Sequence, residues 1–243
     1  MLPARPPSLR NAFATPETKR IYVRGLFSKI APRYDLITVL LSYGQDRRWK
    51  RRLAAMADAG PGMAVLDLAC GTGDIAFETA SNGARVTGLD ITERMLEIAR
   101  RKPESARYGV SFVTGDMTAL PFSDGSFDVV TTGYGLRNVP QLSVALSEIA
   151  RVLVPGGRLL SLDFDRPSNP AVRAVYLGYL TLVGSTLGAL LHREPDTYRY
   201  IPESIRRYPG AAGVCTLARE AGFSSCAHNS VLGGLMAIHL ARK

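Results

Sequence analysis

Residues 65–74 read VLDLACGTGD, an apolar run followed by a glycine turn between two carboxylates, Asp67 and Asp74. A short apolar run that ends at glycine predicts a buried strand. Gly71-Thr72-Gly73 then leaves nearly bare backbone just beyond the carboxyl end of that strand. Because open α/β sheets bind ligands at this end of their strands, the stretch predicts a parallel sheet with a ligand-binding turn.

From residue 61 onward, short apolar segments alternate with amphipathic ones. This alternation is typical of a parallel sheet covered by helices on both faces. Residues 226–242 have Gly233-Gly234 at their centre, and Met236, Ile238 and Leu240 follow at every second position. A glycine turn next to an alternating apolar segment predicts an antiparallel hairpin. We therefore expect an α/β fold with a doubly wound, mostly parallel seven-stranded sheet and a C-terminal antiparallel hairpin. The parallel strands are expected at residues 64–68, 85–90, 110–114, 127–132 and 158–164.

Two segments between these strands have helical periodicity. Residues 92–102 have Thr92 as a candidate N-cap and Lys102-Pro103 as a stop. The apolar face of this helix is predicted to comprise Met95, Leu96, Ile98 and Ala99. A second helix is predicted before the breaker Pro155-Gly156-Gly157. Its apolar face is predicted to comprise Val144, Ile149, Val152 and Leu153.

Length and composition favour one domain. The chain has 243 residues, of which 46% are hydrophobic, and this is enough for a packed core. Residues 1–20 are rich in proline at their start and lack the apolar core of a secretory signal, so we expect a flexible leader. Residues 21–243 are expected to form a single domain, with a helical N-terminal cap at about 21–60 and a substrate-covering insertion at about 166–210.

The net charge and one long uncharged segment indicate which kinds of partner the protein could contact. A formal charge of +9 and a pI near 9.7 favour contact with nucleic acid, phospholipid headgroups or an acidic small molecule. Residues 174–191 carry no formal charge and reach about the lower length limit of a membrane span. Glycines and hydroxyl-bearing side chains dilute this segment, so we expect a buried or interfacial helix.

Cysteine and histidine positions indicate neither disulfides nor a metal. Cys70, Cys215 and Cys226 lie far apart without a C-x-x-C pair, which favours a reducing cytoplasm. Cys70 has no histidine near it in sequence, so we expect it to pack rather than to act as a nucleophile. No metal is expected, because no ligand spacing connects the three histidines, His192, His228 and His239.

The acids around the glycine turn favour a cationic ligand. A dinucleotide site would place a pyrophosphate beside Asp67 and Asp74, where like charges repel. The ammonium and sulfonium groups of S-adenosylmethionine suit these carboxylates better. Asp90 ends the second strand, where a carboxylate can accept the ribose hydroxyl protons.

The third strand end completes the expected nucleoside site. Asp116 follows that strand and can accept the adenine amino protons. Ile91 and Met117 can supply apolar surfaces to the adenine ring. Three acids at successive strand ends, together with the glycine turn, predict S-adenosylmethionine as the cofactor.

Longer motifs resemble one family, the ubiquinone/menaquinone biosynthesis C-methyltransferases, within the class I S-adenosylmethionine-dependent methyltransferases. The resemblance runs from residue 23 to the C-terminus. It rests on FSKIAPRYDLITVLLSYGQDRRWKR at 27–51, VLDLACGTGD at 65–74, GYGLRNVP at 133–140 and YRYIPESIRRYP at 198–209. It implies a Rossmann-like fold and methylation of a ring carbon of a demethylated prenyl quinol, either demethylmenaquinol or a ubiquinone precursor.

The resemblance also implies site residues. Arg137, Tyr34 and Asn138 are expected to form the active site. Arg137 would stabilise a phenolate, and the other two would position the substrate hydroxyl or a water. Together with the reasoning from strand ends, the expected cofactor-binding residues are Asp67, Gly71, Thr72, Gly73, Asp90, Ile91, Asp116, Met117 and Gly133.

The chain departs from the family pattern at two places. It has Gly133-Tyr134-Gly135 where many relatives have Ser-Phe-Gly, and it has Asp163 and Asp165 in LDFDRP where relatives commonly read Leu-Glu-Phe-Ser-Lys-Pro. These changes alter the expected local hydrogen bonds.

A prenyl tail would need an apolar channel, so residues 174–191 are expected to pack as a helix over the cleft. The surrounding arginines could rest on anionic lipid, or the helix could be an ordinary buried one with a solvated basic rim. The sequence leaves peripheral membrane contact, a homodimer, the quinone type and the tail length open.

Three alternative functions remain at this point. An RNA or DNA methyltransferase fits the charge, but no appended binding module, (D/N/S)PP(Y/F) tetrapeptide or interleaved aromatic and basic pattern accompanies it. We therefore expect no nucleic-acid partner. A non-catalytic quinone-binding protein and a methyltransferase for another small aromatic acceptor are the others.

Overall fold

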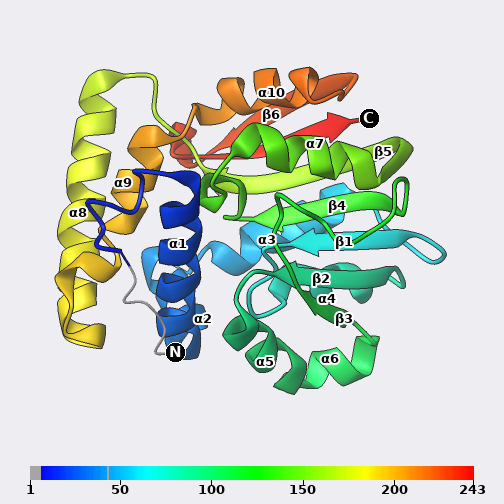
Figure 1. The fold of residues 1–243 in the computed structure, drawn as a ribbon, viewed down its shortest axis with the longest axis horizontal. Helices are drawn as coiled ribbons and strands as arrows, with labels where there is room; N and C mark the ends of the chain where they lie inside the picture. Colours follow the sequence, from blue (N-terminus) through cyan, green and yellow to red (C-terminus); the bar gives the residue numbers. More distant parts are fainter. Residues whose placement is uncertain (1–6, 43) are drawn as a thin grey trace.

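The computed structural model describes residues 7–42 and 44–243, and a seven-stranded sheet forms its centre (Figure 1). The strand order is β3-β2-β1-β4-β5-β7-β6, in which β7 runs antiparallel to both of its neighbours and the other pairs are parallel. The expected fold class is confirmed. The strands are β1 (Ala64–Leu68), β2 (Arg85–Asp90), β3 (Ser111–Thr114), β4 (Phe127–Gly133), β5 (Leu153–Phe164), β6 (Ser225–Val231) and β7 (Met236–Arg242).

Helices cover both faces of the sheet. On one face, α3 (Asp46–Ala57) and α4 (Asp74–Ala80) pack on β1, β4 and β5 through a core that includes Leu53, Ile75 and Val129. On the other face, α7 (Leu142–Val152) and α10 (Gly210–Glu220) pack on the same strands through a second core. Residues 21–60 were expected to form a separate helical cap. Part of this segment, α3, instead packs directly on one face of the sheet.

The helix predicted at 92–102 is confirmed as α5 (Glu93–Arg101), followed after Lys102 by α6 (Pro103–Tyr108). Thr92 occupies the N-cap position, but its side chain makes no capping hydrogen bond. In α7 the predicted apolar face is wrong at Val144, which is exposed. The buried face is centred one residue later, on Ala145, Leu146 and Ile149.

The predicted break at Pro155-Gly156-Gly157 is also displaced. Helix α7 ends at Val152 and β5 begins at once with Leu153, which pairs with Phe127. The register then shifts, and Arg158 pairs with Val129. The proline and glycines therefore lie in an irregular stretch inside the strand, where a missing N–H and a positive φ are tolerated.

The N-terminal segment is ordered earlier than expected. Helix α1 (Pro16–Ile30) starts with a capping box between Thr15 and Thr18 and with proline in its first turn, so 20 is the wrong boundary for a leader. Phe13 stacks on Tyr200 with ring centroids 5.6 Å apart. Residues 1–6 lie outside the described residues. After α1 the chain continues through η1 (Ala31–Arg33) and α2 (Tyr34–Leu41).

The segment between β5 and α10 forms α8 (Pro170–His192), η3 (Pro195–Thr197) and α9 (Tyr200–Arg207). Helix α8 stands beside α1 at one end of the sheet (Figure 1). Within the described part of the chain, α8 alone is long and apolar enough to cross a membrane by length and composition, and 22% of its most apolar window is buried.

The expectation of no disulfide is wrong for one pair. Cys215 in α10 is bonded to Cys226 in β6. Eleven residues separate the two cysteines in sequence, and the α10–β6 packing brings them together. Cys70 is buried, and burial raises the pKa of its thiol well above the ordinary value, as a packing role requires.

Candidate active site

The β1–α4 loop turns sharply between the sheet and α4. Gly71 and Gly73 have φ of 55° and 90°, and a Cβ at Gly73 would lie 2.7 Å from the Phe77 ring. Asp90, at the end of β2, holds this loop, because its Oδ2 accepts from the Gly71 N–H at 2.9 Å and its Oδ1 accepts from the Thr92 N–H at 2.8 Å. Burial raises the pKa of Asp90, and these two bonds oppose the rise.

A small cavity opens where this loop meets the ends of β2 and β3. Asp116 lies in its wall and accepts two bonds from Thr118 through Oδ1. Asp116 Oδ2 is buried without a hydrogen-bond partner, and Arg20 Nη1 lies 3.6 Å from it. An acceptor in the cavity wall that has no hydrogen-bond partner fits an amino group such as that of adenine.

The structure brings together most of the expected cofactor-binding residues. Those that line the small cavity are Gly71, Asp90, Ile91, Asp116, Met117 and Gly133. Three others, Asp67, Thr72 and Gly73, do not line it. Thr72 instead donates to Asp35 Oδ1 at 2.6 Å, and Gly73 only shapes the turn. Arg20 and Val23 of α1 also line the cavity, and no strand-end pattern could have indicated them.

Asp67 lies inside the sheet. It is fully buried, its Oδ1 accepts from Thr131 Oγ1 at 2.7 Å, and its Oδ2 has no partner. Burial raises the pKa of Asp67 to about 7, although its hydrogen bonds lower it. The Asp67 side chain therefore connects β1 to Thr131 of the neighbouring strand β4.

Replacing Asp67 with asparagine should make stability less dependent on pH. Because the folded carboxyl keeps a proton that the unfolded one releases, the free energy of unfolding falls as pH rises toward 7. Relative to wild type, Asp67→Asn should therefore gain on the order of 3 kcal/mol between pH 5 and pH 8. Urea unfolding at both pH values measures this gain. Asp124→Asn, at an exposed site, is the control, and an equal difference at both pH values would contradict the prediction.

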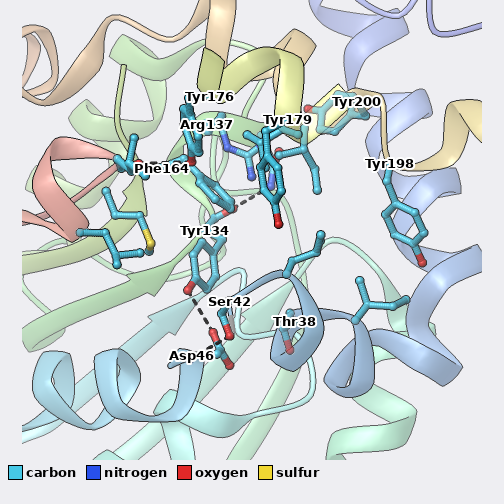
Figure 2. A pocket seen from close by; sticks show the side chains of 18 of the residues that line it. Thr38, Ser42, Asp46, Tyr134, Arg137, Phe164, Tyr176, Tyr179, Tyr198 and Tyr200 are labelled. Atoms are coloured by element: carbon cyan, nitrogen blue, oxygen red, sulfur yellow. Dashed lines mark hydrogen bonds between the residues drawn. The ribbon is translucent and has the colours of Figure 1, made fainter. Parts of the chain in front are cut away.

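A second, larger cavity of about 660 Å³ lies between the sheet and the helices α1, α2, α8 and α9 (Figure 2). Most of its wall is apolar and comes from α1, α2, α8, α9 and the β6–β7 turn. Tyr134 points toward Asp46 at one side of the cavity, and Arg137 lies at the opposite side (Figure 2). The cavity suits a long apolar molecule with a small polar head.

The two cavities share a wall. It consists of Phe27, Tyr34, Tyr134 and Asn138. Tyr34 lies over the glycine loop, since a Cβ at Gly71 would be 3.6 Å from its ring. Burial raises the pKa of Tyr34 well above its ordinary value, so its hydroxyl stays protonated. A group in one cavity can therefore meet a group in the other at this wall.

Asn138 presents an acceptor at this wall. Its Nδ2 donates to the Tyr134 carbonyl at 2.7 Å, so the amide orientation is set by a group that can only accept. Asn138 Oδ1 is buried and has no partner. It is placed to accept from a hydroxyl.

Arg137 lines the larger cavity but is held by a buried carboxylate. Its Nε donates to Asp163 Oδ1 at 3.2 Å, its backbone N–H donates to Asp163 Oδ2 at 3.0 Å, and Nη1 donates to Ser204. Its guanidinium also lies 5.0 Å from the centroid of the Phe164 ring. Asp163, one of the departures from the family pattern, thus orients Arg137.

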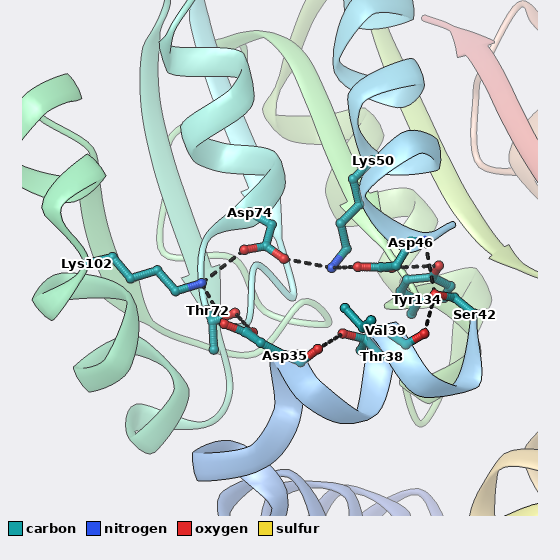
Figure 3. A network of polar contacts seen from close by, with 10 residues as sticks. All are labelled: Asp35, Thr38, Val39, Ser42, Asp46, Lys50, Thr72, Asp74, Lys102 and Tyr134. Carbon is teal, nitrogen blue, oxygen red and sulfur yellow. Dashed lines mark hydrogen bonds and ion pairs between the residues drawn. The ribbon is translucent and has the colours of Figure 1, made fainter. Parts of the chain in front are cut away.

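A chain of ion pairs connects the larger cavity to the cofactor loop (Figure 3). Lys50 contacts Asp46 at 2.6 Å and Asp74 at 2.9 Å. Lys102 continues the chain, with Asp74 at 3.0 Å and Asp35 at 2.9 Å. Asp74, which was expected to face a cationic ligand, is neutralised by these lysines. Burial alone would raise the pKa of Asp74, but the lysines lower it to about 2.

No metal centre is evident in the described ranges, where no group of three or more His, Cys, Asp or Glu side chains is arranged to hold an ion.

The strand order, the glycine turn after β1 and the acids after β2 and β3 define a class I methyltransferase. The chain belongs to the ubiE/COQ5 methyltransferase family, whose sequence model matches residues 15–243. This confirms the resemblance stated above.

Relatives support the assignment along nearly the whole chain. The chain is 42% identical over 222 residues to "Demethylmenaquinone methyltransferase" of Beutenbergia cavernae, an alignment that covers 91% of this chain and 90% of that protein. It is 39% identical over 245 residues to "Ubiquinone/menaquinone biosynthesis C-methyltransferase UbiE" of Paracoccus denitrificans, with 98% of each chain covered. A solved SAM-dependent methyltransferase from Thermotoga maritima, titled a possible histamine N-methyltransferase, shares the fold with a TM-score of 0.65 and 20% identity, over 91% of this chain and 99% of that chain.

Proposed function

We propose that this protein transfers the methyl group of S-adenosylmethionine to a ring carbon of a demethylated prenyl quinol. Family membership and the names of its relatives support S-adenosylmethionine-dependent C-methylation in quinone biosynthesis. The observation that carries the proposal is the shared wall, because it joins the cavity at the strand-end acids to the larger, mostly apolar cavity. A prenyl tail fits that cavity, and the quinol ring would lie at the wall.

The residues present fit the cofactor. Gly71 allows close approach to the loop, Asp90 is placed to accept from the ribose, and the unpaired Asp116 Oδ2 is placed to accept from adenine. When bound, S-adenosylmethionine supplies a methyl group on a positively charged sulfur. The protein then contributes mainly alignment, and alignment can lower such a barrier by about 7–11 kcal/mol.

The roles of the acceptor-side residues follow from their contacts. Asn138, which lines both cavities, positions the quinol ring at the shared wall. Tyr34 closes the wall over the glycine loop and keeps water from the transfer position. Arg137, oriented by Asp163, adds positive potential on the side where phenolate charge develops.

A methylation assay tests the function. The purified protein would be incubated with methyl-labelled S-adenosylmethionine and, separately, with demethylated naphthoquinols, demethylated benzoquinols, simple phenols and RNA. We expect label in a prenylated quinol, with kcat/KM rising with tail length, and none in RNA. If cofactor binds but no quinol becomes labelled, the proposal fails; label in simple phenols alone would favour the small-aromatic alternative.

The surface of α8 supports a further proposal about how the substrate enters. Val175, Leu182 and Leu190 are 75%, 70% and 74% exposed, and they recur at helical spacing on one side of α8. Val172 and Val175 also line the larger cavity, so the exposed apolar face continues into it. With exposed arginines such as Arg193 nearby, this face suits peripheral contact of a cytoplasmic enzyme with an anionic bilayer.

The variant Leu182→Asp/Leu190→Asp should lose vesicle binding by at least about tenfold, because two exposed leucines would no longer enter the bilayer. Co-sedimentation with phosphatidylcholine vesicles, with and without phosphatidylglycerol, measures this loss. Neither residue lines a cavity, so turnover of a short-tailed soluble quinol should be unchanged. Val144→Asp, which removes an exposed valine from α7, is the control, and equal vesicle binding by all three proteins would contradict the proposal.

A further inference from the structure

One carboxylate stands in the wall of the larger cavity. Asp46 is the only Asp or Glu among the described residues that line it, and its exposed fraction is 2%. Tyr134 Oη donates to Asp46 Oδ1 at 3.0 Å (Figure 2). Tyr134 lies in the turn after β4, whereas Asp46 lies at the start of α3. None of the roles described so far uses this pair.

The backbone holds Tyr134 under strain. Its φ is +60°, a conformation that costs a bulky residue about 1–3 kcal/mol. Its N–H donates to the Leu162 carbonyl at 2.7 Å. On one side, a Cβ at Gly133 would lie 2.6 Å from Ile75, and on the other, a Cβ at Gly135 would lie 2.3 Å from Thr132. Closely packed glycines thus flank a tyrosine whose ring forms part of the shared wall.

Charged groups lie next to the pair. Lys50 at 2.6 Å is the cation that faces it from its own helix, and Asp74 of α4 lies beyond Lys50. Tyr34 and Asp163 are the other titratable groups that act on Tyr134. Burial by itself lowers the pKa of Lys50, but Tyr34, Asp74 and Asp46 raise it above its ordinary value, so the lysine stays charged.

The Tyr134 phenol is neutral and directed at Asp46. Burial and the Asp46 carboxylate raise its pKa well above the ordinary value. A neutral hydroxyl that already donates to a carboxylate has free lone pairs, and it can receive a second proton as it gives up its first. This is the arrangement of a proton relay.

We propose that Tyr134 receives the proton of the quinol hydroxyl while Asp46 receives the proton of Tyr134. This inference rests on the proposed function. The O–H bond of the quinol breaks, and its electron pair enters the ring and makes the ring carbon nucleophilic. A new O–H bond forms on Tyr134 as its original O–H bond passes to Asp46 Oδ1. After methyl transfer the hydrogen on the methylated carbon leaves as a proton to water, the ring regains aromaticity, and the oxygen recovers the stored proton.

The substitutions Asp46→Asn and Tyr134→Phe test this relay in the full-length protein. Each should lower kcat by about 100-fold, the lower end of what a positioned base contributes. The KM for the quinol should stay within about threefold, because neither change removes the apolar cavity. Asp46→Asn/Tyr134→Phe should be no slower than either single variant, since both changes disable one relay.

The pH profile separates a relay from a merely structural pair. With the relay, wild-type kcat should depend little on pH around neutrality. Without it, kcat should rise about tenfold per pH unit, because reaction then depends on spontaneous loss of the hydroxyl proton. A fluorinated quinol with a more acidic hydroxyl should restore most of the lost rate in Asp46→Asn and should change the wild-type rate little.

Two substitutions outside both cavities serve as controls for the relay. Asp124→Asn and Tyr108→Phe make the same chemical changes away from both cavities and should leave kcat unchanged. If Asp46→Asn does not fold, Tyr134→Phe still decides, because it leaves the Asp46–Lys50 ion pair in place. Full activity in the folded variants, or a loss that the acidic quinol does not restore, overturns the relay alone. A wild-type protein that binds cofactor but methylates no quinol overturns the proposed function, and the relay with it.

Discussion

Replacing Arg137 with alanine should lower turnover by about 100- to 1000-fold, the usual cost of losing one charged group that stabilises an oxyanion. It should also lower the free energy of unfolding by about 3–5 kcal/mol, because Asp163 would remain as an unpaired buried charge. Stopped assays with labelled methyl donor and urea unfolding measure the two effects. The cofactor Kd should change little, since Arg137 does not line the smaller cavity.

A second substitution separates the two effects. In Arg137→Ala/Asp163→Asn the uncompensated carboxylate is gone, so most of the stability should return while turnover stays low. Burial already raises the pKa of Asp163 and Arg137 opposes that rise, so the single variant should be least affected at low pH, where Asp163 is protonated. Turnover near the wild-type rate in the double variant would show that Arg137 acts only by pairing with Asp163.

Asp90→Ala should raise the Kd for S-adenosylmethionine by about 100-fold or more. The substitution removes the ribose acceptor, and it also leaves the N–H groups of Gly71 and Thr92 without their partner, which costs about 1–3 kcal/mol each. The glycine loop would then lose its preformed shape. Calorimetric titration with the cofactor or its demethylated product measures the change.

A matched control for Asp90→Ala is Glu97→Ala on α5, whose carboxylate pairs only with Arg94 at the surface. Its cofactor affinity should equal that of wild type. If Asp90→Ala bound the cofactor as tightly as Glu97→Ala, the acid at the end of β2 would have no part in nucleoside binding.

The parallel sheet was predictable because its signals are local. Apolar runs that end at glycine or aspartate indicate β1 and β2. The Gly233-Gly234 turn and the alternating apolar residues after it indicate the hairpin of β6 and β7. Errors arose where two patterns competed. In α7, Val144 and Ala145 both fit an apolar stripe, and only packing against the sheet shows that the smaller residue faces inward.

The cavity at the strand ends was predictable for the same reason, since parallel strands bring their carboxyl ends to one edge. Asp90 and Asp116 needed only the strand order. Asp67 does not line this cavity, because its side chain is buried within the sheet, where it accepts from Thr131.

On the acceptor side the family motifs indicated Tyr34, Arg137 and Asn138, which line the larger cavity, but not the contacts between distant elements. The contact of Asp46 with Tyr134 spans 88 positions, and Lys50 meets Asp74 across 24. Cys215 and Cys226 meet only because α10 packs beside β6. These contacts depend on how helices settle on the sheet, and no short motif encodes that.

The division of the two cavities between different parts of the chain affects how such an enzyme can diverge. The strand ends and α1 line the smaller cavity, whereas α8 and α9 line only the larger one of the two. Substitutions in those helices can therefore alter which molecule is methylated without weakening the grip on the donor. Lineages that made different lipid-soluble electron carriers could have kept one catalytic framework and exchanged only its outer shell.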